Sequence, residues 1–170
     1  MAKSKFPTNQ DALDAIFKES IPLFAKYGFS GVSIRQVASA VGLSIATIYH
    51  HFPDKKALYL SSIEAWFKDK AEQLEQALKA NGSVEEQLTR FIYSFTVLMA
   101  KDQDFRLLLQ RELLEADPDR LSVLASSVFL TQFENVLRLA ERISPNSDSH
   151  MTALSMFSLV FYHLEATPIR

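Results

Sequence analysis

The sequence contains no cysteine among its 170 residues. That absence excludes disulfide bonds, thiolate zinc sites and cysteine nucleophiles, and it is compatible with the cytoplasm, where we expect this protein. Long apolar runs are missing too: no stretch approaches the roughly 18 residues of a membrane-spanning helix, and the polar N-terminus has no signal-peptide core. We therefore expect neither secretion nor membrane insertion.

Glycine and proline are sparse as well, with four and six residues, and they fall mainly at breaks between segments. No alternating strand pattern of six or more residues is present. Hydrophobic residues make up 48% of the chain and charged residues 22%, proportions that are ordinary for folded globular proteins. Because nearly all the boundary signals between segments are residues typical of helix starts and helix ends, the sequence predicts an all-α fold.

Positive charge is concentrated near the N-terminus, although the formal net charge is only −2. Residues 1–56 hold seven Lys or Arg against four Asp or Glu, a net charge of +3, whereas residues 57–170 hold eleven against sixteen, a net charge of −5. This pattern suits a chain that presents one end to a polyanion, but a difference of this size is a weak argument alone.

Two short helices joined by a glycine turn are predicted at residues 33–41 and 44–51. Ser33 begins a capping-box pattern for the first helix. Gly42 can adopt a positive φ and turn the chain sharply, and Ser44 then caps the second helix. The pair matches a helix-turn-helix in length and spacing.

The second of these helices has the composition of a DNA-reading helix. It buries Ile45 or Ile48 and offers small and hydroxylated side chains that let its backbone approach a groove closely. Side chains that can donate to phosphates and base edges are Ser44, Thr47, Tyr49 and His50. The expected partner is therefore double-stranded operator DNA.

A longer pattern surrounds these two helices, between about residue 10 and residue 60. It consists of Ser33-Ile34-Arg35-Gln36-Val37-Ala38, Gly42-Leu43-Ser44, Thr47-Ile48-Tyr49-His50-His51-Phe52 and Asp54-Lys55-Lys56-Ala57-Leu58. This pattern resembles the N-terminal signature of the TetR family, which implies a homodimeric transcriptional repressor. The resemblance implies DNA contacts from Ser33, Thr47, Tyr49 and Lys55. We add Arg35 and Ala46, from the same two helices, to the expected DNA-binding set.

The resemblance also implies a division of the chain into two domains. The first, residues 1–53, is a three-helix DNA-binding domain, and the second, residues 54–170, is a helical domain for effector binding and dimerisation. A helix of about 40 Å that begins at Asp54 can link them. Family members usually continue into a ninth helix, whereas the sequence ends at Arg170 after the eighth that we assign, so the expected dimer bundle lacks a final helix.

The second domain is rich in large apolar side chains, which have two interpretations. They line a cavity for an apolar or aromatic effector, or they fill a core, and a single residue of this kind is more often core. The expected effector-pocket residues are Trp66, Phe91, Phe95, Met99, Phe105, Leu108, Phe129 and Phe133. Under the first interpretation, a small-molecule effector releases the DNA.

A final apolar helix is predicted over roughly residues 150–165, with a stripe too broad and apolar for a solvated helix. The expected dimer-interface residues are Met151, Leu154, Phe157, Val160, Phe161 and Leu164. Packing of this stripe on its own two-fold mate would place two reading helices about 34–36 Å apart, one turn of B-DNA.

An enzyme would need parts that the sequence lacks. There is no nucleophile elbow, phosphate loop, dinucleotide fingerprint or metal motif. His50 and His51 are adjacent, so they point about 100° apart on a helix, whereas paired metal histidines usually recur at i, i+4. We therefore expect no enzymatic activity, no cofactor and no metal. The alternative function is a DNA-binding protein with the same N-terminal module that senses no ligand and acts through a protein partner or by organising DNA.

Overall fold

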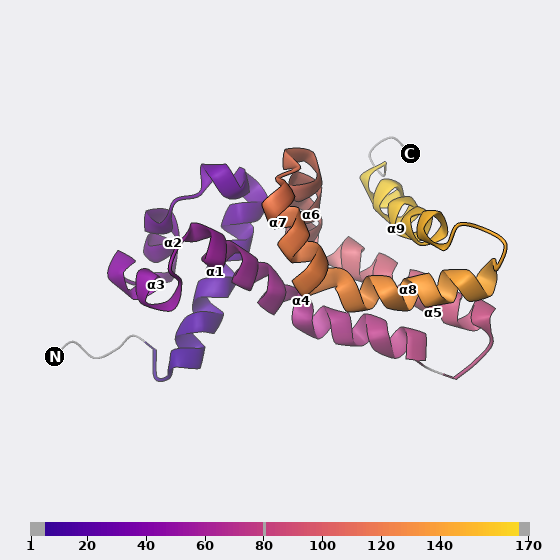
Figure 1. The fold of residues 1–170 in the computed structure, drawn as a ribbon. Helices are drawn as coiled ribbons and strands as arrows, with labels where there is room; N and C mark the ends of the chain where they lie inside the picture. The colour runs from indigo at the N-terminus through magenta and orange to yellow at the C-terminus, as the bar shows by residue number, and fades with distance from the viewer. Residues whose placement is uncertain (1–5, 80, 167–170) are drawn as a thin grey trace. The chain divides into compact units, whose positions relative to one another are not determined.

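The computed structural model describes residues 6–79 and 81–166, which form helices joined by short turns (Figure 1). The helices are α1 (Asn9–Gly31), α2 (Ile34–Val41), α3 (Ile45–His51), α4 (Lys55–Lys79), α5 (Val84–Lys101), α6 (Gln103–Glu115), α7 (Pro118–Val123), η1 (Leu124–Phe129), α8 (Leu130–Ile143) and α9 (Ser149–Glu165). No strand occurs in these two ranges, and the predicted all-α fold is confirmed.

Most helices begin at the capping residues that the sequence marks. Ser33 and Ser83 each form a complete capping box with the Gln or Glu three residues later. Asp117 caps α7 through its side chain, and Pro118 takes the first helical position, where its missing N–H leaves no bond unmade. These bonds join residues three apart, so the chain forms them without help from distant segments.

Two helical segments are irregular. Gly28 breaks α1 with φ 72° and ψ 170°, a conformation nearly restricted to glycine, and another turn follows as far as Gly31. The helical stretch over residues 118–143 contains the π-helical segment η1 between α7 and α8. Since π-helical turns have no strong sequence marker, the pattern of apolar residues did not reveal it.

The helices group into two compact units. The first comprises residues 1–67 and 104–124, and the second residues 68–103 and 125–170, so α4 contributes to both. These units follow contacts within the chain, and the functional division at residues 53 and 54 stays a prediction. None of the helices in the described ranges is long and apolar enough to cross a membrane.

The core of the first unit forms where α1 to α4 meet. Ile16, Val37, Ile48 and Leu58 are completely buried there. Phe52 is buried too, with its ring 5.8 Å from another phenylalanine ring on α1, and it closes this small core.

The α6 helix belongs to the same unit and holds the C-terminal part of α1. The Arg111 guanidinium donates to the carbonyl oxygens of Ala25 (2.7 Å) and Lys26 (2.8 Å). Carbonyls near a helix end lack partners within the helix, and a cation satisfies them well.

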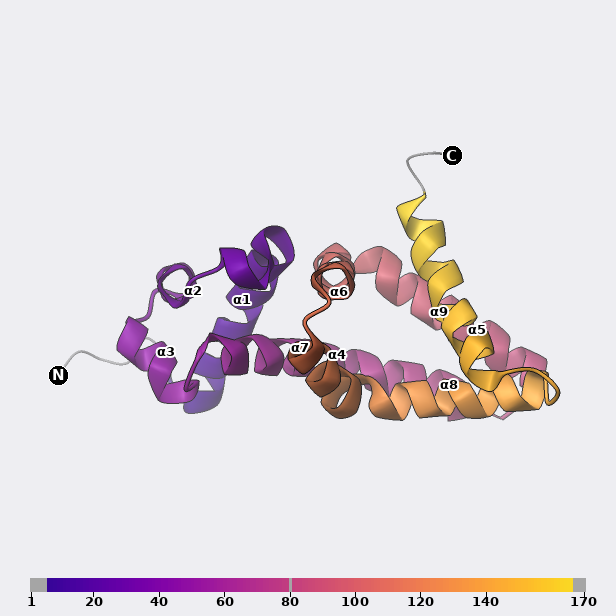
Figure 2. The same ribbon diagram turned by 45° about the horizontal axis from the view of Figure 1, so that its top comes forward.

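The core of the second unit lies among α5, α8 and α9, and α9 packs on both other helices (Figure 2). Phe91 and Phe95 of α5 are buried with nearly parallel rings 5.8 Å apart. The Phe157 ring of α9 meets both of them edge-on, at 5.8 and 5.2 Å. This aromatic cluster gives the unit its own core.

Candidate nucleic-acid interface

The helix pair α2–α3 has the geometry of a helix-turn-helix. Gly42 lies between the two helices in the left-handed region, at φ 73° and ψ 37°, and its N–H donates to the last carbonyls of α2. Ser44 caps α3 by accepting from the Thr47 backbone N–H at 3.0 Å. The predicted positions of the turn and of both caps are confirmed, which orients α3 relative to α2.

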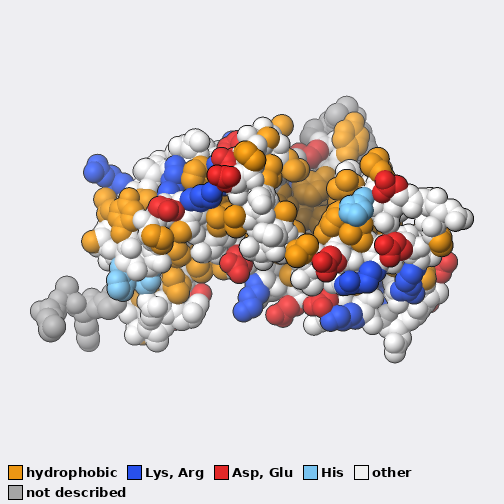
Figure 3. Space-filling model, viewed as in Figure 1, with side chains coloured by type: hydrophobic (Ala, Val, Ile, Leu, Met, Phe, Trp, Pro, Cys, Tyr) orange, Lys and Arg blue, Asp and Glu red, His pale blue; other side chains and the backbone are white. Residues whose placement is uncertain are grey.

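One side of α3 is buried and the other is exposed. Ile48 is completely buried, whereas Ile45 is 37% and Tyr49 51% exposed. From the sequence we expected either Ile45 or Ile48 to be buried, and the structure selects Ile48. Figure 3 shows hydrophobic side chains at the surface over α2 and α3. An exposed face of this composition on a short helix can contact base edges and thymine methyl groups.

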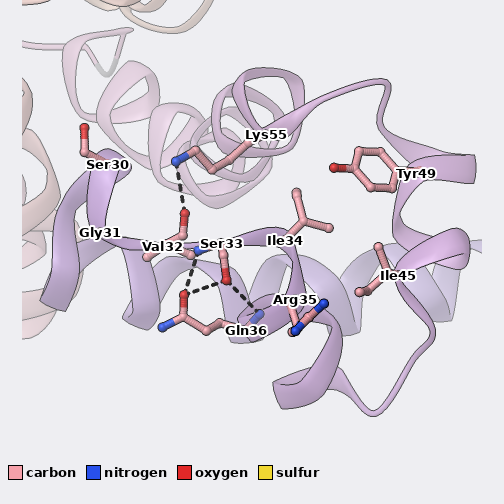
Figure 4. A pocket seen from close by; sticks show the side chains of 10 residues that line it. All are labelled: Ser30, Gly31, Val32, Ser33, Ile34, Arg35, Gln36, Ile45, Tyr49 and Lys55. Carbon is pink, nitrogen blue, oxygen red and sulfur yellow. Dashed lines mark hydrogen bonds between the residues drawn. The ribbon is translucent and has the colours of Figure 1, made fainter.

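The exposed face of α3 borders an open hollow of about 530 Å³ (Figure 4). Its lining comes from the end of α1, the start of α2, α3 and the start of α4. The lining residues are Ser30, Gly31, Val32, Ser33, Ile34, Arg35, Gln36, Ile45, Tyr49 and Lys55. In Figure 4 the Tyr49 hydroxyl points across the hollow toward Ile34 and Lys55.

Lys55 has a fixed place in this hollow. Its ammonium group donates to the carbonyl oxygens of Phe29 (2.9 Å) and Val32 (3.0 Å), and it lies 4.4 Å from the centroid of the Phe29 ring. An ammonium has three donors. Two carbonyl bonds therefore leave a third donor that can reach a phosphate oxygen, and they also give Lys55 a structural role that the sequence did not predict.

Three hydroxyl groups of the expected DNA-binding set take part in helix capping. The Ser33 hydroxyl lies 2.8 Å from Gln36 Oε1, and the hydroxyls of Ser44 and Thr47 lie 2.8 Å from each other. Each oxygen has two lone pairs, so capping does not use up its hydrogen-bonding capacity. These bonds restrain the three exposed or half-buried side chains.

The hollow brings together only part of the expected DNA-binding set. Ser33, Arg35, Tyr49 and Lys55 line it, whereas Ser44, Ala46, Thr47 and His50 lie elsewhere on the exposed or half-buried surface of α3. The lining residues that we missed from the sequence are Ser30, Gly31, Val32, Ile34, Gln36 and Ile45. These residues lie close in sequence to the helix caps Ser33 and Ser44. That closeness could have identified them, because residues beside a helix cap lie on the same part of the protein surface. DNA contact by either set stays a prediction.

The expected effector-pocket residues belong to different units. Trp66, Phe105 and Leu108 fall in the first unit, where the Phe105 ring stacks on Phe67 at 5.6 Å. The other five fall in the second unit: Phe91, Phe95, Met99, Phe129 and Phe133. Phe91, Phe95 and Met99 are buried and Phe133 stacks near Phe157, so these residues pack as core, and their role in an effector pocket stays a prediction.

The expected dimer stripe on α9 is divided between two faces of the helix. Val160 is buried, and the Phe157 and Phe161 rings contact those of α5, so these three side chains lie on the inner face. Met151 and Leu154 are exposed. Contact of the expected residues with a second copy stays a prediction. The apolar residues surround most of the helix, so a stripe read from the sequence mixes an inner and an outer face.

The outer face of α9 is formed by four exposed apolar side chains. Its residues are Met151 (62% exposed), Leu154 (50%), Leu159 (71%) and Tyr162 (72%). At about 100° per residue these four lie on the side of the helix opposite Val160. We missed Leu159 and Tyr162 from the sequence, although the helical period places them beside Met151.

The N-terminal segment matches a known family. Residues 16–61 match the family model described as bacterial regulatory proteins, tetR family. The HTH-type transcriptional regulator YerO of Bacillus subtilis (strain 168) is 47% identical over 51 residues, which cover 30% of this chain and 18% of that protein. The HTH-type transcriptional repressor AcnR of Corynebacterium glutamicum is 33% identical over 79 residues, which cover 46% and 39%. The matches thus span less than two fifths of these curated relatives.

Solved structures share the fold over most of the chain. FadR from Bacillus subtilis, solved in complex with stearoyl-CoA, has a TM-score of 0.79 at 15% identity and covers 92% of this chain and 87% of that one. PfmR from Thermus thermophilus, a TetR family transcriptional regulator, has a TM-score of 0.69 at 23% identity and covers 89% and 85%. Residues 16–61 thus carry the N-terminal domain of the tetR family of bacterial regulatory proteins, and most of the chain shares the fold of these solved structures.

Proposed function

We propose that this protein is a sequence-specific DNA-binding transcriptional regulator, a repressor that an apolar effector releases from its operator. The observation that carries the proposal is the hollow in which the exposed face of α3 meets the fixed ammonium of Lys55. A helix with exposed small, hydroxylated and aromatic side chains suits the major groove, and a cation beside it suits the phosphate backbone. Relatives named as repressors, such as AcnR, support this direction of regulation.

The DNA-binding part is tested with Tyr49→Ala. The probe is a duplex of about 30 base pairs, three helical turns, that the wild-type protein recovers from a randomised pool. Because Tyr49 projects into the hollow, we expect the substitution to weaken binding about tenfold or more, the value of one good groove contact. Tyr27→Ala is the matched control, because Tyr27 is 47% exposed on α1 and lies outside the hollow. The duplex affinity of this variant should stay within twofold of wild type, roughly the scale of neutral surface substitutions. Equal losses in both variants would contradict the assignment of α3.

The proposed assembly is a homodimer formed through the outer face of α9. Four large apolar side chains at 50–72% exposure on one face are unusual for a helix that meets only water. A two-fold axis through such a face lets each residue contact the same surface of a second copy. Two reading helices one turn of B-DNA apart would then bind a palindromic site.

The proposed effector is apolar and binds the helical body of residues 54–170. The aromatic residues of that body support this, and the B. subtilis FadR structure shows that a protein of this fold can carry an acyl-CoA. In our proposal the ligand tilts the distal part of α4, which is continuous with the segment that begins at Lys55. Thermodynamic linkage then requires operator DNA to lower the affinity for the ligand by the same factor by which the ligand lowers the affinity for DNA.

Calorimetry with stearoyl-CoA as the probe, with and without saturating duplex, measures this reciprocity. We expect a change of about 5–150-fold in ligand affinity, the usual range of allosteric coupling. Equal affinities for a ligand that binds would remove the sensing mechanism. No binding at all would exclude this ligand and favour the alternative, a DNA-binding protein that acts through a protein partner.

A further inference from the structure

Arg120, at the start of α7, is the centre of a buried ionic cluster in the first unit. It is only 6% exposed. Its guanidinium pairs with three carboxylates, those of Glu112 (Nε–Oε2 3.2 Å), Glu115 (Nη2–Oε2 2.7 Å) and Asp117 (Nη1–Oδ2 3.4 Å). A planar group held from three directions has little freedom to rotate or shift.

The Glu112 carboxylate is held from a second side as well. The Tyr59 hydroxyl donates to Glu112 Oε1 at 2.5 Å. Burial raises the pKa of Tyr59 above its ordinary value, and the bond to Glu112 raises it further, so this hydroxyl stays protonated and remains a donor. The cluster therefore ties α4, α6 and α7 together at one point.

Arg120 reaches the DNA interface through a single aromatic ring. Its guanidinium carbon lies 4.5 Å from the centroid of the Phe29 ring, and the Lys55 ammonium lies 4.4 Å from the same centroid. The Tyr59 ring packs edge-on against Phe29 at 5.2 Å. The Phe29 ring thus contacts both the Arg120 guanidinium and the Lys55 ammonium.

Lys55 in turn holds the chain that enters α2. Its bonds to the carbonyls of Phe29 and Val32 fix the segment just before Ser33, which caps α2 and lines the hollow. The contacts therefore run without a gap from three carboxylates at α6 and α7 to the wall of the DNA interface. None of the three carboxylates lies in the hollow itself.

We propose that Arg120 is a positioning residue for the DNA interface, and that it acts on Lys55 and Val32 through the Phe29 ring. The inference rests on the proposed DNA-binding function and adds a determinant outside the helix-turn-helix. A buried ion pair stabilises a fold little compared with an apolar replacement of the same volume. The cluster does, however, hold the Arg120 guanidinium in one orientation. A side chain held in this way can position the Phe29 ring that it contacts.

The test measures duplex affinity for Arg120→Met, Phe29→Leu and the double variant, with the same selected duplex of about 30 base pairs. Each single variant should weaken binding about fivefold or more, because cation–π contacts of this kind have that value when they are partly desolvated. Both substitutions break one chain of contacts, so the double variant should bind no more weakly than the weaker single variant. A purely structural role would instead give losses that multiply.

Arg90→Met is the matched control. The Arg90 guanidinium donates to the carbonyls of Ala77 and Asn81 in the second unit, so its loss also removes hydrogen bonds that join a side chain to the backbone. We expect its duplex affinity to equal that of the wild type. Circular dichroism at the binding temperature checks that every variant is folded. If Arg120→Met does not fold because Glu112 is left unpaired, Glu112→Gln/Arg120→Met takes its place, since it removes the uncompensated charge.

Three results would overturn the inference. They are wild-type affinity in folded Arg120→Met, multiplicative losses in the double variant, and an equal loss in Arg90→Met. In each of them the wild-type protein still binds its duplex, so the proposed function stands while the role of Arg120 falls. A wild-type protein that recovers no duplex from the pool would instead remove the proposed function, and the role of Arg120 with it.

Discussion

Replacement of Lys55 by methionine tests the structural and the DNA-binding roles of one side chain together. Methionine keeps much of the length of the side chain but removes the charge and all three donors. The substitution deletes two hydrogen bonds, of 2.9 and 3.0 Å, to the carbonyls of Phe29 and Val32 and the cation–π contact at 4.4 Å. Because the bonds tie the start of α4 to the end of α1, their loss should be felt both in stability and in the shape of the hollow.

The expected loss of stability follows from these contacts. A hydrogen bond to a charged group contributes about 1.5–3 kcal/mol, and an exposed cation–π contact about 0.5–1 kcal/mol. Lys55 is only partly buried, and water can reach the two carbonyls once the ammonium is gone. We therefore expect a loss of about 1–3 kcal/mol in the free energy of unfolding rather than the full sum. For DNA, one lost phosphate contact lowers the slope of log affinity against log salt by about 0.9.

Urea denaturation followed by circular dichroism measures the first effect, and a salt titration of duplex binding measures the second. Lys56→Met is the control on the neighbouring residue, because Lys56 lies 3.9 Å from a carboxylate of Asp119 that is 85% exposed. Such surface pairs contribute under about 1 kcal/mol. An unchanged urea midpoint in Lys55→Met would refute the role of the carbonyl bonds. Lost stability with an unchanged salt slope would show that Lys55 is structural and touches no phosphate.

Three further predictions concern the break in α1, the assembly and the response to acid. Gly28→Ala should lower the free energy of unfolding by about 2–4 kcal/mol, because φ 72° with ψ 170° strains any side chain and the new Cβ would lie 2.9 Å from Glu115 Oε1; an unchanged urea midpoint would contradict this. Tyr162→Glu should shift the protein from dimer to monomer in sedimentation, whereas Tyr93→Glu, at 70% exposure on α5, should not; a dimer in both variants would exclude the outer face of α9. The pKa of Asp117 is held below its ordinary 3.8, first by the hydrogen bond from a backbone N–H of α7. The contribution of this carboxylate to the free energy of unfolding is therefore complete above pH 3.8 and is lost as the pH falls through the lowered pKa. Acid titration of Asp117→Asn should lack this part of the loss of stability, and a loss identical to that of the wild type would refute the prediction.

Much of the fold could be predicted because its signals are local. The capping boxes at Ser33 and Ser83 and the turn at Gly42 each depend on bonds within about four residues, which neighbouring positions in the sequence reveal directly. Burial of Ile48 could be predicted only as one of two alternatives, because a helix of seven residues has too few apolar positions to define a face. The π-helical segment Leu124–Phe129 was not predictable, since its apolar spacing does not differ from that of an ordinary helix.

The sequence by itself determined the helices, their caps and the helix-turn-helix, because these depend on neighbouring residues. Only the tertiary structure decided what the side chains do. Lys55 binds carbonyls 26 and 23 positions earlier in the chain, and Arg120 reaches Phe29 from another helix. The same holds for α9, where apolar residues surround the helix and only the packing of α5 decides that Phe157 faces inward and Tyr162 outward. The physical reason is that side-chain roles are set by partners distant in the sequence, which no local pattern records.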